Sequence, residues 1–327
     1  MQSINSRHLL PPKIHRMPRF LRKGKQACYH VTSRINGRAF LLNDVEKEAL
    51  RSLLRRVAAF CGVKILTYAI LDNHFHLLVE VPAGPGELSD DELLERARLL
   101  YGHERKGQPL SLLKIELALK ADPVTRAAMR EILLRRMASL PMVMKILKQR
   151  YSLLYNRKHD RVGTLWEDRF HSVLVENNPA TLRAVAAYID LNPIRAGVVR
   201  DPKDYRFSGY GEAAGAKGGW SSYPLFQHLA AGHAESISTI AALYRRYLYV
   251  SGSDPRKGRV LAEKDIAAVL ASGGHVSAAQ LLHCRLRYMT TGAVIGTRAF
   301  LEKHLAKHPR ILRRLTSPDL TLLTESP

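Results

Sequence analysis

The feature that most constrains the fold is a pair of β-rich runs, residues 63–71 and 74–81, which only Asp72 and Asn73 separate. Asp and Asn favour tight turns, so the two runs predict a β-hairpin. Apolar residues at helical spacing over residues 44–60 predict a helix just before it. Helix, turn and hairpin together indicate the α+β class.

The rest of the chain predicts mainly helices. Residues 28–34 and 169–176 are expected to be two further strands, and 179–191 a helix that begins after Asn178, a residue suited to capping. Residues 236–315 are expected to be helical, with breaks at 252–258, 273–274 and 290–292. The expected parts are a basic N-terminal arm at 1–24, an α+β domain at 25–210 with a helical insertion at about 88–159, and a helical C-terminal region at 225–315.

Charge restricts the class of partner. The chain has 51 Lys and Arg against 29 Asp and Glu, a net charge of +22 and a pI near 10.2. Such an excess favours nucleic acid, and a basic solubilising surface is the alternative. No apolar run approaches the roughly 20 residues of a membrane helix, so no membrane partner is expected. The N-terminus lacks a signal-peptide pattern and the three cysteines form no CxxC pair, which favours the cytoplasm.

Two histidines stand two residues apart in the second strand of the hairpin, as His74-Phe75-His76. Side chains alternate along a strand, so both imidazoles should lie on one face while Phe75 lies on the other. Two imidazoles so placed can converge on one divalent ion. Packing without a metal is the alternative.

The helix expected at 179–191 carries Tyr188, and Asn192 follows it by four residues. Residues so spaced lie on the same side of a helix. Tyr188 can be a nucleophile, but most buried tyrosines belong to the core. Asn192 precedes Pro193, so it can equally be a local cap.

Two segments carry a family resemblance. His74-Phe75-His76 matches a histidine-hydrophobic-histidine motif, and Tyr-Ile-Asp-Leu-Asn-Pro-Ile-Arg-Ala-Gly at 188–197 matches a block with a nucleophilic tyrosine. In both, the chain resembles the single-tyrosine HUH transposases of insertion sequences, in the branch of REP-associated tyrosine transposases. Residues 155–157, 163–170 and 204–210 also resemble this branch, so the likeness covers about 18–210.

The resemblance implies a ferredoxin-like central antiparallel sheet with helices on its faces. It implies that Tyr188 attacks single-stranded or hairpin DNA to give a 5′-phosphotyrosine, and that His74 and His76 hold Mg²⁺ or Mn²⁺. Imidazole ligands favour Mn²⁺ over Mg²⁺. Relatives carry glutamine as a third ligand where this chain has the shorter Asn192.

Basic and aromatic residues between and after the motifs suit contacts with a single strand, since guanidinium and ammonium groups bind phosphates and aromatic rings stack on bases. Core packing is the alternative for Trp166, and a surface or structural role is the alternative for Arg195. The predicted DNA-binding residues are Arg157, Lys158, Arg161, Trp166, Arg169 and Arg195.

Other functions remain open. A domesticated relative that only binds structured nucleic acid would have the same charge, and a zinc hydrolase would use the histidine pair but lacks a recognisable third ligand. Residues 264–270 and 278–284 could form a helix-turn-helix or merely part of a bundle. The sequence is compatible with a monomer or a homodimer.

Overall fold

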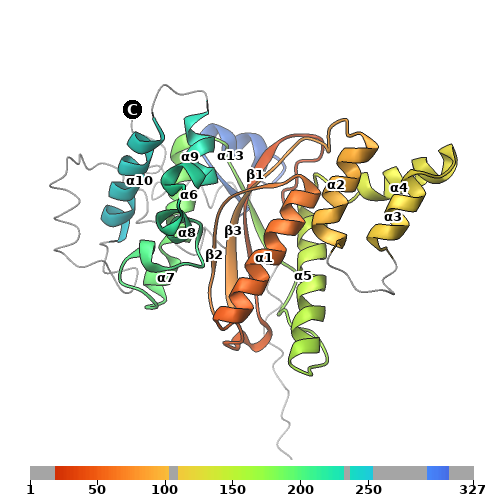
Figure 1. Ribbon diagram of the computed structural model, residues 1–327. Coiled ribbons are helices and arrows are strands. Elements are labelled where there is room, and N and C mark those ends of the chain that lie inside the picture. Colours follow the sequence, from red (N-terminus) through yellow and green to blue (C-terminus); the bar gives the residue numbers. More distant parts are fainter. Residues whose placement is uncertain (1–18, 103–109, 232–235, 253–292, 309–327) are drawn as a thin grey trace, which may run out of the picture.

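The centre of the protein is a five-stranded sheet in the order β2-β3-β1-β4-β5 (Figure 1). The computed structural model describes residues 19–102, 110–231, 236–252 and 293–308. The first four strands pair antiparallel, and β5 pairs parallel to β4. The strands are β1 (Ala27–Arg34), β2 (Lys64–Ile70), β3 (His74–Val81), β4 (His171–Val175) and β5 (Val294–Ile295).

Helices cover both faces of this sheet (Figure 1). The α-helices are α1 (Asp44–Cys61), α2 (Asp90–Tyr101), α3 (Leu112–Leu119), α4 (Pro123–Leu134), α5 (Leu140–Lys158), α6 (Pro179–Asp190), α7 (Asn192–Arg195), α8 (Gly209–Gly215), α9 (Pro224–Ala230), α10 (Ile237–Gly252) and α13 (Arg298–Leu305). Short 3₁₀ turns are η1 (Asn36–Arg38), η2 (Pro202–Asp204) and η3 (Gly219–Ser222).

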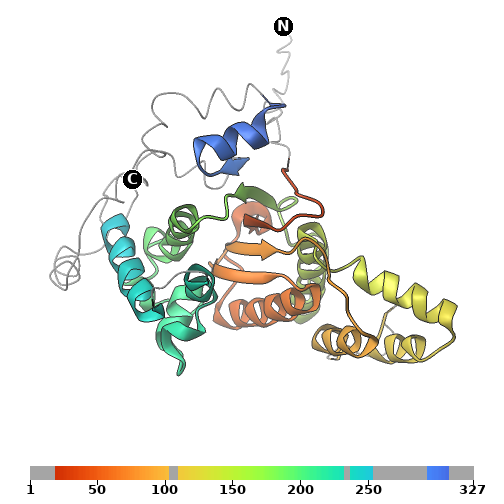
Figure 2. The same cartoon turned by 90° about the horizontal axis from the view of Figure 1, so that it is seen from above.

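The chain order β1-α1-β2-β3-α5-β4 and the strand order together make a ferredoxin-like arrangement, with α1 and α5 side by side on one face. The predicted α+β class is confirmed. Within the segment at about 88–159, α5 belongs to this core, because it packs on α1 and the sheet. Helices α2 to α4 form the inserted part, and α3 and α4 project from the body (Figure 2).

Alternation along the strands builds two separate cores. Tyr29 and Val31 of β1 and Phe75 of β3 are buried on the side of α1 and α5. Cys28 of β1 and Leu78 of β3 are buried on the opposite side, against α6 and the helices that follow it. Because Leu78 lies on the α6 side, the side chains of β3 that alternate with Phe75 face α6. Complete burial of one such aliphatic or aromatic side chain contributes roughly 1.5–3 kcal/mol to stability.

Local signals placed most element ends to within one or two residues. The hairpin between β2 and β3 is present, and the Leu71 amide donates to the carbonyl of His74 at 2.8 Å. Asn43 caps α1 by accepting from the Glu46 amide at 3.0 Å, and Asn178 caps α6 in the same way. These caps satisfy amides that a helix leaves without an internal partner.

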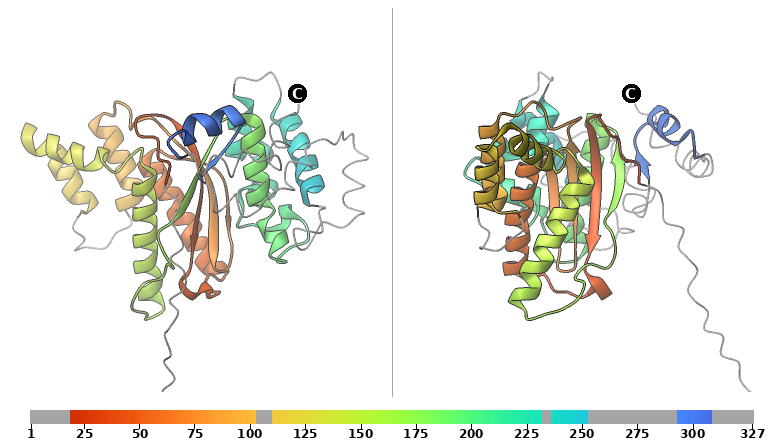
Figure 3. Two further views of the ribbon diagram at one scale, coloured as in Figure 1. Left: turned by 180° about the vertical axis from the view of Figure 1, so that it is seen from behind. Right: turned by 90° about the vertical axis from the view of Figure 1, so that its right-hand side faces the viewer.

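The chain beyond α6 stays on the same body. Helices α8, α9 and α10 cover the α6 side of the sheet, and α13 lies at the β5 edge (Figures 1 and 3). The sequence predicted helices with breaks over 236–315 and no strand, whereas Val294 and Ile295 add a strand beside β4. The candidate helix-turn-helix segments and residues 1–18 of the arm lie outside the described residues.

Candidate functional site

His74 and His76 lie on the face of β3 that α6 covers. The alternation of the strand places them there, and their ring centroids are 5.1 Å apart with an angle of 76° between the rings. His76 is buried, whereas His74 is partly exposed at the beginning of the strand. The shared face that the sequence predicted for the pair is confirmed.

The Nδ1 atom of each histidine has a neighbour. His74 Nδ1 is 2.6 Å from Asn73 Oδ1, and the Nδ2 of Asn73 donates to the carbonyl of Arg38. His76 Nδ1 is 3.0 Å from Nε2 of His30. Burial lowers the pKa of His74 to about 4, and burial with the neighbouring His30 lowers that of His76 well below its ordinary value. Both imidazoles are therefore neutral near pH 7, which metal ligation requires.

His30 is a member of this cluster that the sequence interpretation missed. It lies on β1, buried, and its ring stacks on that of His76 with centroids 5.2 Å apart and 18° between the planes. A partial signal existed, because His30, Thr32 and Arg34 occupy every second position of the first strand and Tyr29 and Val31 flank His30. That alternation marks a polar face, but only strand pairing shows which polar residues it meets.

Tyr188 lies on the same side of the sheet as the histidines and packs against them from α6. It is on α6, 7% exposed, and its ring centroid is 5.8 Å from that of His76 and 5.7 Å from that of His30. Its hydroxyl has no hydrogen bond to the described residues. Burial raises the pKa of the phenol, while the charges of Arg195 and Arg34 act in the opposite direction. The tyrosine thus packs edge-on against two imidazoles, with its reactive group unpaired.

Arg195 approaches Tyr188 from α7. Its Cζ lies 4.8 Å from the centre of the tyrosine ring, and its Nη1 donates to the Tyr188 carbonyl at 2.8 Å. Its Nη2 is buried and has no hydrogen-bond partner among the described residues. Desolvation lowers the pKa of Arg195 to about 10, so it still carries its charge near pH 7. This guanidinium has one donor group free for an anion.

Asn192 caps the end of α6. Its Nδ2 donates to the carbonyls of Tyr188 and Ile189 at 2.8 and 3.3 Å. This is the capping role that the following Pro193 had left open. In the described ranges, no three His, Cys, Asp or Glu side chains are arranged to hold a metal ion, so the pair of His74 and His76 has no third ligand of these types.

The predicted DNA-binding residues at the end of α5 and after it differ in whether an acidic partner pairs with them. Arg157, Arg161 and Arg169 are exposed. Lys158 pairs instead with Glu46, a buried carboxylate on α1, at 2.6 Å. That carboxylate accepts a second hydrogen bond from the neighbouring His159, so this part of α5 is fixed to α1.

The base-stacking role predicted for Trp166 is not supported by its surroundings. Only 6% of its surface is exposed, its ring packs edge-on against Phe75 at 5.6 Å, and its Nε1 donates to the carbonyl of Lys148. Both the apolar ring and the polar Nε1 of the indole therefore have partners inside the protein. Its role is core packing on the α1 and α5 side, away from the histidine face.

A buried carboxylate fixes the helix that carries Tyr188. Asp190, fully buried two residues further on, accepts hydrogen bonds from Thr67 of β2 at 2.8 Å, from Tyr223 at 2.8 Å and from Tyr244 of α10 at 2.6 Å. Burial raises its pKa to about 6. Three hydroxyl donors thereby connect α6 to the sheet and to the C-terminal helices.

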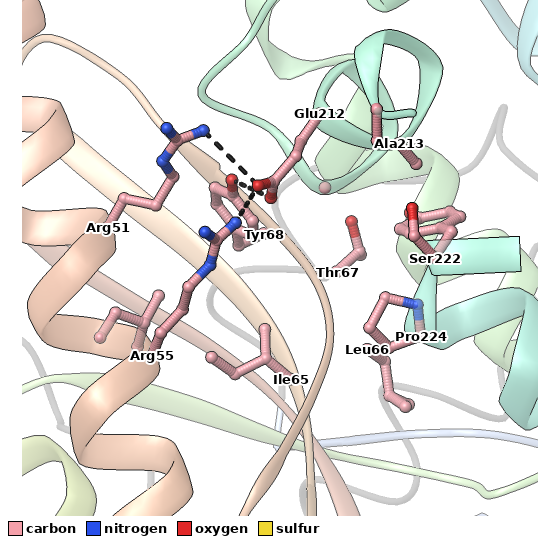
Figure 4. A pocket seen from close by; sticks show the side chains of 14 residues that line it. Arg51, Arg55, Ile65, Leu66, Thr67, Tyr68, Glu212, Ala213, Ser222 and Pro224 are labelled. Carbon is pink, nitrogen blue, oxygen red and sulfur yellow. Dashed lines mark hydrogen bonds and ion pairs between the residues drawn. The ribbon is translucent and has the colours of Figure 1, made fainter. Parts of the chain in front are cut away.

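A cavity of about 380 Å³ lies between α1, β2 and α8 (Figure 4). Glu212 reaches towards its rim, where it pairs with Arg55 and accepts a hydrogen bond from the Tyr68 hydroxyl at 2.8 Å. The rest of the lining is mostly apolar, with Ile65 and Leu66 of the edge strand. None of the catalytic candidates lines this cavity.

These features define an α+β protein with a histidine pair, a facing tyrosine and a free arginine donor on one side of a ferredoxin-like sheet. Residues 24–85, which include β1 and the histidine strand, match the family model described as "Transposase IS200 like". The family resemblance inferred from the sequence is confirmed over this segment.

A solved REP-associated tyrosine transposase bound to a REP hairpin is similar to the chain at 17% identity and a TM-score of 0.37. The match covers 67% of this chain and 93% of that one. No curated protein matches the sequence. Among the described residues no helix is both long and apolar enough to cross a membrane.

Proposed function

We propose that the protein is a DNA strand transferase that cleaves and rejoins single-stranded DNA through Tyr188. The observation that carries the proposal is the position of the Tyr188 ring, 5.8 Å from that of His76 on the polar face of the sheet. The transposase family model matches the segment with the histidines, although it ends before the tyrosine. The net charge of +22 favours a polyanionic substrate.

The proposed cofactor is a divalent cation of the Mg²⁺ or Mn²⁺ type, held by His74, His76 and Asn192. His74 and His76 are neutral, share one face and have Nδ1 atoms that neighbours already occupy, so Nε2 is the atom left for a metal. In this proposal Oδ1 of Asn192 is the third ligand, because its Nδ2 already donates to the helix. Such an ion would neutralise charge on the phosphate as a Lewis acid.

The chain's own groups supply the nucleophile and part of the charge stabilisation. The Tyr188 oxygen forms a bond to phosphorus, the bond from phosphorus to the 3′ oxygen breaks, the phenol loses its proton and the 3′ oxygen gains one. A 5′-phosphotyrosine and a free 3′-hydroxyl result, and the reverse reaction joins a new strand without ATP. The free Nη2 of Arg195 is suited to bind a nonbridging oxygen.

Hairpin-bearing single strands are the proposed substrate. A continuous duplex would hold its phosphates away from a tyrosine that is 7% exposed, whereas a single strand can bend into the site. The exposed Arg157, Arg161 and Arg169 can hold its backbone. The single-stranded flank is the flexible target, and the hairpin is the rigid structure beside it that the protein can recognise.

The test is formation of a covalent protein–DNA adduct. The protein is incubated with labelled hairpin DNA that has single-stranded flanks, in the presence of Mn²⁺, and the adduct is resolved on a denaturing gel. The wild type should form it and Tyr188→Phe should not. Tyr210→Phe is the matched control, because the Tyr210 hydroxyl is buried without a hydrogen-bond partner among the described residues and should be dispensable.

Other results would change the conclusion. An adduct formed equally by the wild type and Tyr188→Phe would show that another residue is the nucleophile. Tight hairpin binding without an adduct, insensitive to a chelator and to His74→Ala, would favour the non-catalytic nucleic-acid-binding alternative.

A further inference from the structure

His30 is a buried polar residue whose ring contacts both His76 and Tyr188. It pairs with Leu78 in the β1–β3 register, so it is a diagonal neighbour of His76 on the same face of the sheet. Its Nε2 lies 3.0 Å from Nδ1 of His76, and its ring also packs edge-on against Tyr188. Among the described residues, no other aromatic ring packs against both the His76 ring and the Tyr188 ring.

Two neutral imidazoles share only one proton across such a contact. Either Nδ1 of His76 donates to His30, or Nε2 of His30 donates to His76. In the first arrangement Nε2 of His76 keeps a lone pair. In the second it carries a proton and cannot bind a cation. The tautomer of His30 therefore decides whether His76 can be a ligand.

The surroundings favour donation by His76. The only hydrogen bond of His76 among the described residues involves Nδ1, so a proton on Nε2 would have no protein acceptor. A lone pair at Nε2 leaves no donor of this ring without a protein acceptor.

The other histidine of the pair already has the corresponding arrangement. Oδ1 of Asn73 can only accept, and its orientation is fixed because Nδ2 donates to the carbonyl of Arg38. His74 must therefore carry its proton on Nδ1, which leaves Nε2 free. A matching tautomer of His76 would give two equivalent nitrogen donors.

We propose that His30 is a positioning residue of the metal site, which accepts the Nδ1 proton of His76 and thereby leaves Nε2 of His76 free for the cation. Stacking on His30 fixes the orientation of the His76 ring. His30 also packs edge-on against Tyr188, so it fixes the position of the His76 ring relative to the nucleophile. This role rests on the proposed function only in that a cation is what His76 would hold.

The first test uses metal-free protein and needs no DNA. Nitrogen-15 NMR of histidine-labelled wild type, assigned with His76→Gln, should show His76 protonated at Nδ1 and bare at Nε2. A spectrum with the proton on Nε2 would overturn the proposal by itself. Failure to form a DNA adduct would leave this result unchanged, so the two proposals fail separately.

The second test measures Mn²⁺ affinity by electron paramagnetic resonance. His30→Phe keeps the ring and its stacking but removes the acceptor, and should weaken Mn²⁺ binding roughly 10- to 100-fold. His30→Gln offers an amide oxygen in the same region and should recover part of this loss. His171→Phe, an exposed histidine of β4, is the matched control and should bind like the wild type.

A purely structural role predicts a different pattern. His30→Phe would then bind Mn²⁺ as the wild type does, with His76 still protonated on Nδ1, and the proposal would be wrong. If His30→Phe does not fold, the wild-type spectrum still decides the question, because it reports on the Nδ1 proton directly, and the Mn²⁺ affinity of His30→Gln gives a second measurement.

Discussion

The guanidinium of Arg195 lies over the ring of Tyr188, with Cζ 4.8 Å from the ring centre, and it also binds the tyrosine's own carbonyl. One arginine therefore fixes the end of α6 and places a positive charge beside the phenol. Burial raises the pKa of this phenol and Arg195 offsets part of that rise. The same cation can serve the phenolate and the phosphate that it attacks.

Replacement of Arg195 should slow the reaction and change its pH dependence. Without the cation the pKa of Tyr188 rises further, so in Arg195→Ala the rate of adduct formation should begin to rise at a higher pH than in the wild type. At pH 7.5 the rate should fall by about tenfold or more. Single-turnover rates from pH 7 to 10 measure both effects. Arg183→Ala, an arginine on the exposed side of α6, should match the wild type.

Asp190 should make the protein less stable as pH rises. Its pKa is raised on folding from 3.8 to about 6, so ionisation costs more in the folded than in the unfolded state. Stability should fall by about 2 kcal/mol between pH 4 and 6, and by about 3 kcal/mol in total between pH 3 and 8. Asp190→Asn is neutral and lacks this decrease. Urea unfolding of both proteins at four pH values measures the difference, with the exposed Asp91→Asn as control. Parallel curves for Asp190→Asn and wild type would contradict the assignment.

Trp166 should matter for stability and not for base stacking. Trp166→Ala removes a buried indole that contacts Phe75 and Tyr151, and should cost about 3–5 kcal/mol of unfolding free energy. Trp166→Phe should cost less because part of the ring volume remains. Denaturant unfolding measures the loss. A stable Trp166→Ala protein with weakened DNA binding would restore the stacking interpretation.

The exposed arginines should act through salt-dependent binding. Arg157→Ala and Arg161→Ala should each reduce the slope of log binding constant against log salt by about 0.7, the amount for one phosphate contact on a single strand. Fluorescence titrations at several salt concentrations measure the slope. Lys158→Ala should behave differently and lower stability, because it leaves the buried carboxylate of Glu46 with one cation fewer. Equal slopes in all variants would place the DNA elsewhere.

The local features of the fold could be predicted because they depend on neighbours in sequence. Alternation placed His74 and His76 on one face, and Asn178 was recognisable as a cap. The strand at Val294 and Ile295 could not be predicted, because two residues have no periodicity. The family block identified Tyr188, but its spacing alone did not distinguish a nucleophile from a core residue.

By itself the sequence determined the class of fold, the polyanionic partner it favours and the histidine strand, since composition and short-range periodicity are properties of the chain alone. Only the tertiary structure decided that His30 contacts His76, that Arg195 covers Tyr188, that Trp166 is buried and that Asp190 fixes α6. The physical reason is that each of these depends on what lies across the sheet or on another helix. All of these contacts except that of Arg195 with Tyr188 join residues far apart in sequence, such as Thr67 and Asp190, which are 123 positions apart. Local patterns carry no signal for such pairs.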